Sequence, residues 1–229
     1  MVTDALADLL LTPSSDANEN LKREGIDGRR VALVGNIMID CLEMMRDKIM
    51  RSPALSDFDM RPKDYFVLTV HRPANMEDPD FIPGLLLKLR GLAKSVRCVF
   101  PVHPRTQKRL KEAGAWDGLA GTKGVTLTAP LGYVDFMRLV FDARFVVTDS
   151  GGIQEEATYL GIPCITLRPN TERPVTITQG TNELGTLQDI DGKVDKILSG
   201  RWKKGSIPPL WDGNTAGRTL KALLAIEGA

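Results

Sequence analysis

The sequence has no surplus of charge of either sign. Its 30 basic and 29 acidic residues leave a formal net charge of +1 over 229 residues. Nucleic-acid-binding proteins usually carry a basic surface, and many membrane-surface proteins carry a polybasic patch. We therefore expect neither a nucleic acid nor a membrane as the partner, and a small polar ligand is the better expectation.

Cysteine and long hydrophobic runs are also scarce. The three cysteines, Cys41, Cys98 and Cys164, lie in apolar or helical segments. An odd number in such settings predicts free core cysteines in a reducing compartment rather than a disulfide framework. The apolar run at 5–11 is interrupted by Asp8 and has no basic flank, which is unlike a signal peptide or a membrane span. These absences predict a cytoplasmic protein.

Short β-branched runs recur along the chain and alternate with segments that have helical spacing. The expected strands are 31–34, 65–70, 97–102, 125–128, 145–148 and 164–167. This alternation predicts an α/β fold with a Rossmann-like, doubly wound, mostly parallel sheet, whose core runs from about residue 60 to 200. The stretch 52–64 is rich in Pro and Asp and is expected to be a surface loop.

The beginning of the chain does not fit this alternation. An apolar run at 6–12 is followed by a Pro-Ser-Ser-Asp turn and a helical stretch at 17–24. A sheet that began at residue 1 would need partner strands for that run, and no earlier strand precedes it. We interpret residues 1–28 as the last piece of an N-terminal domain with its hinge, and residues 29–229 as the Rossmann-like domain.

The stretch TDSGGIQEEA, residues 148–157, follows an apolar run directly. Polar residues and glycine between a strand and helix-forming residues are typical of a strand-to-helix turn. At Ser150, Gly151 and Gly152, a pyrophosphate could reach backbone N–H groups at the positive end of the helix. The alternative is a tight turn in which Ser150 only caps the helix. A nucleophile elbow is disfavoured, because it requires glycine at Thr148.

Several other side chains near the expected ligand edge have two interpretations. Glu156 could accept hydrogen bonds from a ribose diol, although a solvated helix glutamate is the commoner outcome. Phe136, in LGYVDFMRLV, could form a wall for a nucleobase, but its periodicity favours core packing. In the loop RPNTERP, Arg173 could bind a phosphate bidentately, with Glu172 beside it.

The chain has only two histidines, and each follows an expected strand. His71 comes after 65–70, and His103 comes after the next expected strand. In open α/β sheets ligands bind beyond the carboxyl ends of the strands, so both imidazoles should reach the same edge as Ser150. The alternative for either is a histidine that caps a helix. Without a cysteine or an acidic cluster beside them, the histidines do not predict a metal site.

With these motifs laid out, the chain resembles the non-hydrolysing UDP-N-acetylglucosamine 2-epimerases. The motifs that carry the resemblance are NLKREGI, VGNIMID, VHRPAN, PVHP, PLGYVDFM, TDSGGIQEEA and TERP. They follow the family's order and approximate spacing over nearly the whole chain. The resemblance implies a GT-B architecture of two Rossmann-like domains, in which residues 29–229 form the UDP-binding C-terminal domain and residues 1–28 belong to the N-terminal domain and hinge.

The resemblance also implies roles for the candidate residues. It implies that His71 is catalytic and that Arg72 is a candidate regulatory residue, although Ala74 replaces the glutamate common in the family. It implies UDP-GlcNAc and UDP as ligands, no cofactor or metal, and a homodimer for full-length members. The implied substrate-binding residues are Ser150, Gly151 and Gly152 for the diphosphate, Glu156 for the ribose, Phe136 for the uracil, Arg173 for the phosphate side, and also His103 and Glu172.

The family's reaction is the interconversion of UDP-GlcNAc and UDP-ManNAc by elimination and re-addition of UDP. The chain is much shorter than family members, and the missing N-terminal domain carries the acids proposed to act at C2. The resemblance therefore implies that this chain is the UDP-binding half and is inactive by itself. Two alternatives stay open: the nucleotide-sugar domain of a GT-B glycosyltransferase, and a non-catalytic UDP-binding or regulatory module.

Overall fold

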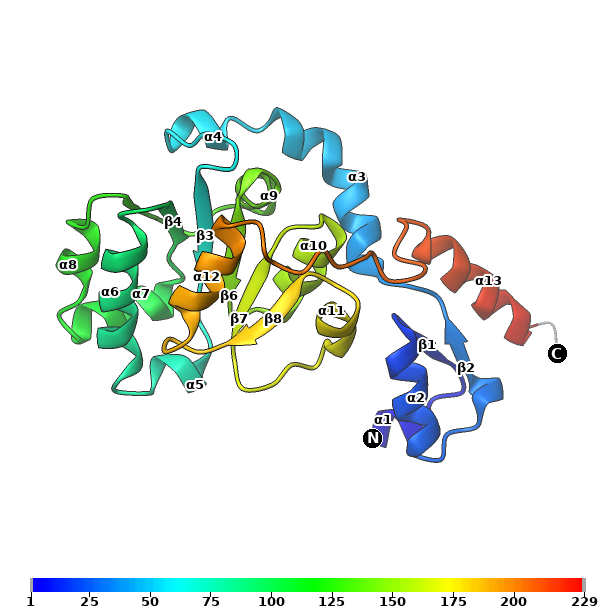
Figure 1. Cartoon of the computed structure of the whole chain (residues 1–229). Helices are drawn as coiled ribbons and strands as arrows, with labels where there is room; N and C mark the ends of the chain where they lie inside the picture. Colours follow the sequence, from blue (N-terminus) through cyan, green and yellow to red (C-terminus); the bar gives the residue numbers. More distant parts are fainter. Residues whose placement is uncertain (1, 228–229) are drawn as a thin grey trace.

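The computed structural model describes residues 2–227, and a six-stranded sheet with helices on both faces forms its main body (Figure 1). The strands run in the order β5, β4, β3, β6, β7, β8, and all neighbours are parallel. They are β3 (Tyr65–Thr69), β4 (Arg97–Pro101), β5 (Val125–Thr128), β6 (Phe145–Thr148), β7 (Cys164–Leu167) and β8 (Asn182–Gly185). The strand order reverses between β3 and β6, so the topological switch point lies between these two strands.

This architecture confirms the predicted fold class, and the sheet is entirely parallel where we expected a mostly parallel one. The expected strands between residues 65 and 167 all form, within one residue at their ends. The prediction missed β8, because its sequence, Asn-Glu-Leu-Gly, has no β-branched residue. Its backbone pairs with β7, and this tertiary pairing outweighs the weak local propensity.

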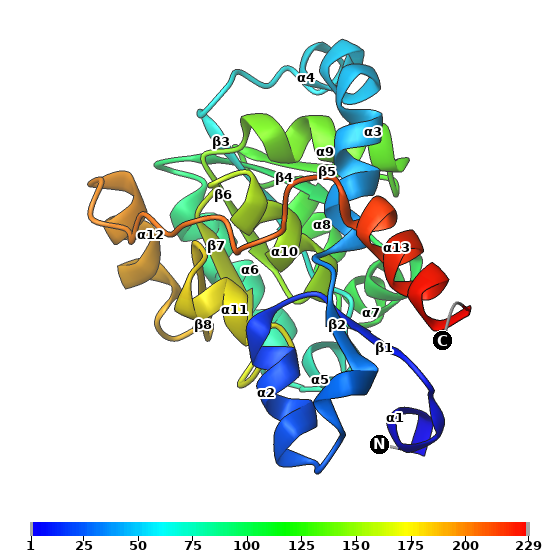
Figure 2. The same cartoon turned by 90° about the vertical axis from the view of Figure 1, so that its right-hand side faces the viewer.

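The N-terminal segment forms a separate small unit (Figure 2). It consists of α1 (Val2–Leu6), β1 (Leu10–Thr12), α2 (Ser15–Arg23), the 3-10 turn η1 (Gly28–Arg30) and β2 (Val31–Leu33). β1 and β2 form a two-stranded parallel sheet, so the expected strand at 31–34 does not join the large sheet. The division of the chain at residues 28 and 29 stays a prediction.

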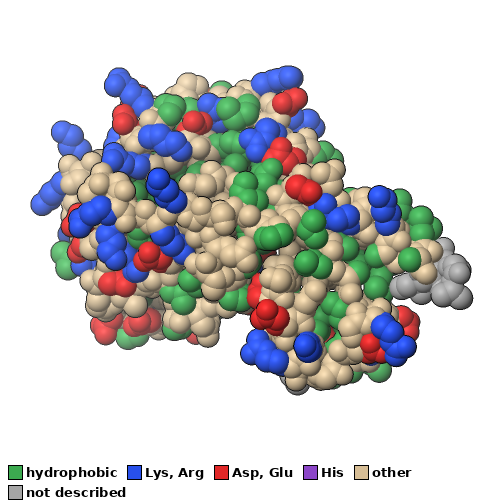
Figure 3. All heavy atoms as spheres, turned by 45° about the vertical axis from the view of Figure 1, so that its right-hand side comes forward, with side chains coloured by type: hydrophobic (Ala, Val, Ile, Leu, Met, Phe, Trp, Pro, Cys, Tyr) green, Lys and Arg blue, Asp and Glu red, His purple; other side chains and the backbone are tan. Residues whose placement is uncertain are grey.

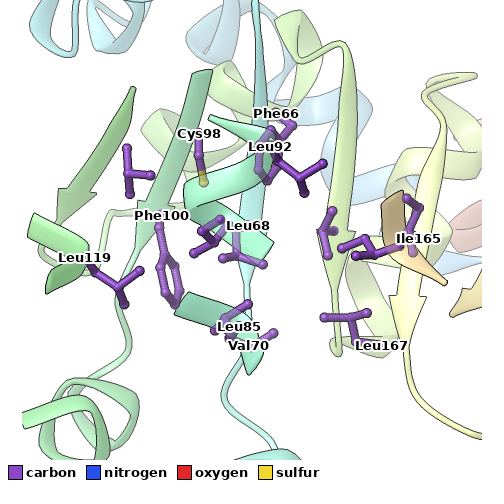
Figure 4. Packing of buried hydrophobic residues seen from close by; sticks show 14 of the residues in the cluster. Phe66, Leu68, Val70, Leu85, Leu92, Cys98, Phe100, Leu119, Ile165 and Leu167 are labelled. Carbon is purple, nitrogen blue, oxygen red and sulfur yellow. The ribbon is translucent and has the colours of Figure 1, made fainter. Parts of the chain in front are cut away.

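Two layers of helices cover the large sheet, one on each face. The strands contact both layers, because alternate strand residues point to opposite faces. Phe66 and Leu68 of β3 pack with α6 (Phe81–Leu92), α7 (Pro104–Glu112), α8 (Trp116–Ala120) and α12 (Ile190–Leu198) (Figure 4). Tyr65 and Val67 pack on the other face with α3 (Ile37–Arg51), α4 (Ala54–Asp57), α9 (Tyr133–Asp142) and α10 (Gly151–Tyr159). Burial on both faces explains why these strands are continuously apolar.

Two local predictions were wrong. Cys98 and Cys164 are buried as expected, but Cys41 is exposed, because it lies on the outer side of α3. The expected surface loop at 52–64 contains α4 and buries Ala54 and Met60 against the second helix layer. Within residues 2–227, no helix is both long enough and apolar enough to span a membrane.

The last helix, α13 (Thr215–Glu227), is tied to the segment that joins the small unit to the large sheet. The carboxylate of Asp40 in α3 accepts hydrogen bonds from the N–H groups of Thr215 and Ala216, at 3.1 and 2.8 Å. Arg218 donates to the carbonyl oxygens of Val34, at 2.5 Å, and Leu210, at 2.7 Å. The C-terminal helix therefore fixes the backbone at the start of α3.

Gly35 lies at the centre of this contact and provides a test of it. Its φ is +94°, and a Cβ there would collide with the carbonyl oxygen of Leu210. We expect Gly35→Ala to lower the free energy of unfolding by about 1–3 kcal/mol, because both the backbone conformation and the contact become strained. Gly192→Ala, inside α12 with open space around it, should instead raise that free energy by about 0.5–1 kcal/mol. Urea unfolding of both variants measures the difference; equal stabilities would contradict the contact.

Candidate functional site

The candidate site lies where β3 and β6 end, at the switch point of the sheet. β3 continues into His71, and β6 continues into Asp149 and Ser150. The N–H of Asp149 donates to the carbonyl oxygen of Thr69 at 3.1 Å, so the two strand ends are still paired as they leave the sheet. The structure thus brings His71 and Ser150 to one edge, as predicted.

Asp149 is the residue that the sequence analysis missed. It is fully buried, and its carboxylate accepts hydrogen bonds from the N–H groups of His71 and Arg72, both at 2.9 Å, and from the side-chain amide of Asn75 at 3.1 Å. Burial raises the pKa of Asp149, but the hydrogen bonds from His71 and Arg72 outweigh it and hold the pKa below its ordinary value. A charged residue directly after an apolar strand was the available signal.

The same carboxylate orients the His71 ring. Nδ1 of His71 lies 3.1 Å from Oδ1 of Asp149, and the side chain of His71 is 41% exposed. This pairing assigns the Nδ1 proton to the Asp149 side and leaves Nε2 as the nitrogen that can meet a ligand. The helix-cap alternative does not apply to His71, because Arg72 is the N-cap residue of the next helix, α5 (Pro73–Met76).

The glycine turn leaves the N-terminus of α10 without a side-chain cap. Ser150 is the N-cap residue, as the alternative interpretation expected, but its side chain makes no capping hydrogen bond. Neither Gly151 nor Gly152 has a positive φ, and a Cβ at Gly152 would meet only Met38, at 3.9 Å. These glycines therefore act through the absence of side chains, although Gly151 is buried and Gly152 is only partly exposed.

Glu156 is 2% exposed, so the alternative of a solvated helix glutamate was wrong. Its carboxylate accepts a hydrogen bond from the hydroxyl of Tyr133 at 2.9 Å. Burial raises the pKa of Glu156 to about 7, and the Tyr133 hydrogen bond only partly opposes this. A buried carboxylate with one partner has the capacity to accept further hydrogen bonds, for example from a diol.

Arg173 and Glu172 lie beside the glycine turn. A Cβ at Gly151 would be 3.3 Å from Oε1 of Glu172 and 3.5 Å from Cζ of Arg173. Arg173 is the N-cap residue of α11 (Pro174–Thr178), and its Nε lies 3.1 Å from a carboxylate oxygen of Glu155. Arg173, the predicted phosphate-binding arginine, is thus near the N-terminus of α10, and its guanidinium group lies beside the carboxylates of Glu155 and Glu172.

The remaining candidates are less specific. His103 caps α7, since its Nδ1 accepts a hydrogen bond from the N–H of Arg105 at 3.2 Å, which confirms the alternative interpretation for this histidine. Its ring centre is 5.8 Å from that of His71. Phe136 is half-buried in α9 and packs against the second helix layer, as its periodicity indicated.

A cavity of about 740 Å³ opens next to this site. It lies between the N-terminal segment, the start of α3, the outer face of α13 and the Glu155–Arg173 pair, and both apolar and acidic side chains line it. Figure 3 shows hydrophobic side chains, in green, on the surface of the N-terminal unit and on the surface of α13. Among residues 2–227, no three His, Cys, Asp or Glu side chains are grouped to hold a metal ion.

Comparisons with known proteins identify the family to which this chain is similar. A family model described as UDP-N-acetylglucosamine 2-epimerase matches residues 1–224. The chain is 38% identical over 191 residues to UDP-N-acetylglucosamine 2-epimerase of Methanocaldococcus jannaschii, covering 80% of this chain and 52% of that protein. It is 33% identical over 225 residues to the protein of the same name from Methanococcus maripaludis, covering 94% of this chain and 60% of that protein.

A solved structure has a similar fold. It is the crystal structure of Methanocaldococcus jannaschii UDP-GlcNAc 2-epimerase in complex with UDP-GlcNAc and UDP, which matches with a TM-score of 0.82 and 33% identity. The match covers 96% of this chain and 62% of the crystallised chain. Our chain therefore spans between half and two thirds of the length of the relatives that it matches.

The raised pKa of Glu156 predicts a pH-dependent effect on stability. The folded chain holds this proton more tightly than the unfolded chain, so the stabilisation is present below the ordinary pKa and is lost as the pH rises through about 7. We expect Glu156→Gln to raise the free energy of unfolding by roughly 1–3 kcal/mol at high pH and by little in mild acid. Urea unfolding across this pH range tests it, and a difference that is the same at every pH would contradict the assignment.

Proposed function

The chain belongs to the UDP-N-acetylglucosamine 2-epimerase family, and we propose that it is the UDP-binding half of an enzyme that interconverts UDP-GlcNAc and UDP-ManNAc. The observation that carries this proposal is the N-terminus of α10, which has no side-chain cap and lies at the switch point between the Asp149–His71 pair and the buried Glu156. A solved relative that binds UDP-GlcNAc and UDP over the same fold supports it.

In this proposal the nucleotide lies across the carboxyl ends of β3 and β6. The N–H groups after Ser150 hold the diphosphate, because a helix N-terminus stabilises negative charge without a cation. Glu156 accepts the ribose hydroxyls, Phe136 lies near the uracil, and Arg173 turns to the phosphates. His103 and Glu172 are the other proposed substrate-binding residues, and Arg72 is the candidate regulatory residue.

The proposed chemistry needs groups that these residues do not supply. Elimination of UDP requires a base for the C2 proton, and epimerisation requires an acid that returns a proton to the opposite face. His71, oriented by Asp149, acts on the UDP side, where negative charge grows on the leaving diphosphate. We therefore assign the acids at C2 to the part of the relatives that this chain does not match.

The small N-terminal unit and α13 offer a surface for that part. Leu220, Leu223 and Leu224 are exposed on α13 at helical spacing, and the large cavity lies beside them. A two-stranded sheet such as β1–β2 is marginal by itself and has edges that can pair with further strands. An α/β partner that extends this sheet and covers the leucines would complete the site. A homodimer of the completed enzyme remains our expectation.

Calorimetry with UDP in the presence of EDTA tests the nucleotide site. We expect binding that survives chelation, and binding of 2′,3′-dideoxy-UDP weakened by about 1–3 kcal/mol, because Glu156 loses its ribose partners. Gly152→Val should abolish binding by blocking the helix N-terminus, without backbone strain, since φ at Gly152 is not positive. Gly192→Val is the matched control and should bind normally. UDP binding that requires a divalent cation would contradict the proposed site.

The second test concerns activity. We expect the chain alone to neither exchange the C2 proton of UDP-GlcNAc nor form UDP-ManNAc, because in this proposal the acids at C2 belong to the region of the relatives that the chain does not match. Proton NMR after incubation in D₂O measures both, and the same assay with the unmatched N-terminal region of a relative added should restore exchange. Deuterium at C2 with the isolated chain would show that its own residues supply the acids. UDP binding without activity in either mixture would favour the non-catalytic module.

A further inference from the structure

Three arginines from two loops surround one carboxylate, that of Glu172. Nη1 of Arg168 lies 2.7 Å from Oε2, Nη2 of Arg72 lies 3.2 Å from Oε1, and Nη1 of Arg173 lies 3.7 Å from Oε1. Arg72 follows β3, and the other two follow β7, so the cluster is assembled by the sheet edge rather than by one loop. Arginines concentrated in this way form an anion site.

The carboxylate of Glu172 lies at the N-terminus of α10, which has no side-chain cap. Its Oε1 is 3.3 Å from the position of a Cβ on Gly151, the first residue of that helix. The N-cap Ser150 supplies no side-chain acceptor to the first turn, and the carboxylate of Glu172 lies beside the first residue of this turn. The carboxylate of Glu172 thus occupies a position where a helix N-terminus and an arginine cluster could together bind a phosphate.

The carboxylate fits this place poorly. Nη1 of Arg168 is buried and makes no hydrogen bond, although it lies close to Oε2 of Glu172. Nε of Arg173 is also buried and makes no hydrogen bond, and the carboxylate near it is that of Glu155. The side chain of Glu172 is itself 43% exposed, so it can swing into solvent without a large loss of packing. A diphosphate carries more charge and more acceptor oxygens than a carboxylate and would satisfy these donors better.

We propose that Glu172 is an exchangeable internal anion: its carboxylate occupies the three-arginine site in the free chain and leaves when a nucleoside diphosphate binds. This inference rests on the proposed function, and it changes the expected role of Glu172 from a ligand of the substrate to a competitor of its diphosphate. Occupancy by Glu172 keeps the three guanidinium groups together while the site is empty, since like charges would otherwise repel. Competition by Glu172 also lowers the affinity of the site for the diphosphate, which favours release of UDP.

The test compares the affinities of Glu172→Gln and the unchanged chain for UDP and for uridine, by calorimetry. We expect Glu172→Gln to bind UDP about three- to thirtyfold more tightly, because the glutamine amide competes weakly for arginine. Uridine affinity should not change, since uridine has no diphosphate. Glu183→Gln is the control with the same change in net charge: Glu183 pairs with Lys193, at 2.8 Å, and should leave both affinities unchanged.

UDP binding that is equal or weaker in Glu172→Gln would overturn the inference and return Glu172 to a supporting or ligand-binding role. If Glu172→Gln does not fold, Glu172→Asp provides the same test, because its shorter side chain withdraws the carboxylate from the arginines and should also tighten UDP binding. Failure of every variant and of the unchanged chain to bind UDP contradicts the proposed function and this inference with it. UDP binding that Glu172→Gln does not tighten contradicts this inference alone.

Discussion

The candidate site depends on one buried carboxylate, that of Asp149. This carboxylate accepts hydrogen bonds from backbone N–H groups in the turn after β3. Asp149 itself directly follows β6. The amide of Asn75, which donates to Asp149, also donates to the carbonyl oxygen of Leu167 at the end of β7, at 3.1 Å. One charge therefore connects the ends of three strands and also fixes the ring of His71. A buried charge is tolerated here because hydrogen-bond donors from His71, Arg72 and Asn75 compensate it.

The sequence was sufficient for the parts of the molecule that local chemistry determines. Continuous β-branched runs identified the central strands, and the polar residues that follow them identified the ligand edge. It was not sufficient where distant segments decide the outcome. The strand at 182–185 forms because β7 is beside it, and the burial of Glu156 depends on how α10 packs. The arginines around Glu172 come from two loops that are about a hundred residues apart in sequence, and no local pattern records their meeting.

The charges around α10 are arranged in opposed pairs rather than as a single positive patch. Arg173 lies between Glu155 and Glu172, and Arg72 lies between Glu172 and the carbonyl oxygen of Asp149. This arrangement explains how a chain with a formal net charge of +1 can present guanidinium groups to an anionic ligand. A field that attracts an anion can be local, so the whole molecule need not be basic.

The contacts between the two ends of the chain have a consequence for the order in which the protein takes shape during synthesis. The indole of Trp211 donates to the carbonyl oxygen of Pro13 at 2.9 Å, and these two residues are 198 positions apart. The residues around Pro13 are therefore synthesised long before the segment around Trp211 that secures them. The large sheet can assemble as its strands emerge, whereas β1 and β2 must wait with their edges uncovered. During synthesis, β1 and β2 therefore stay unsecured until the segment around Trp211 has emerged.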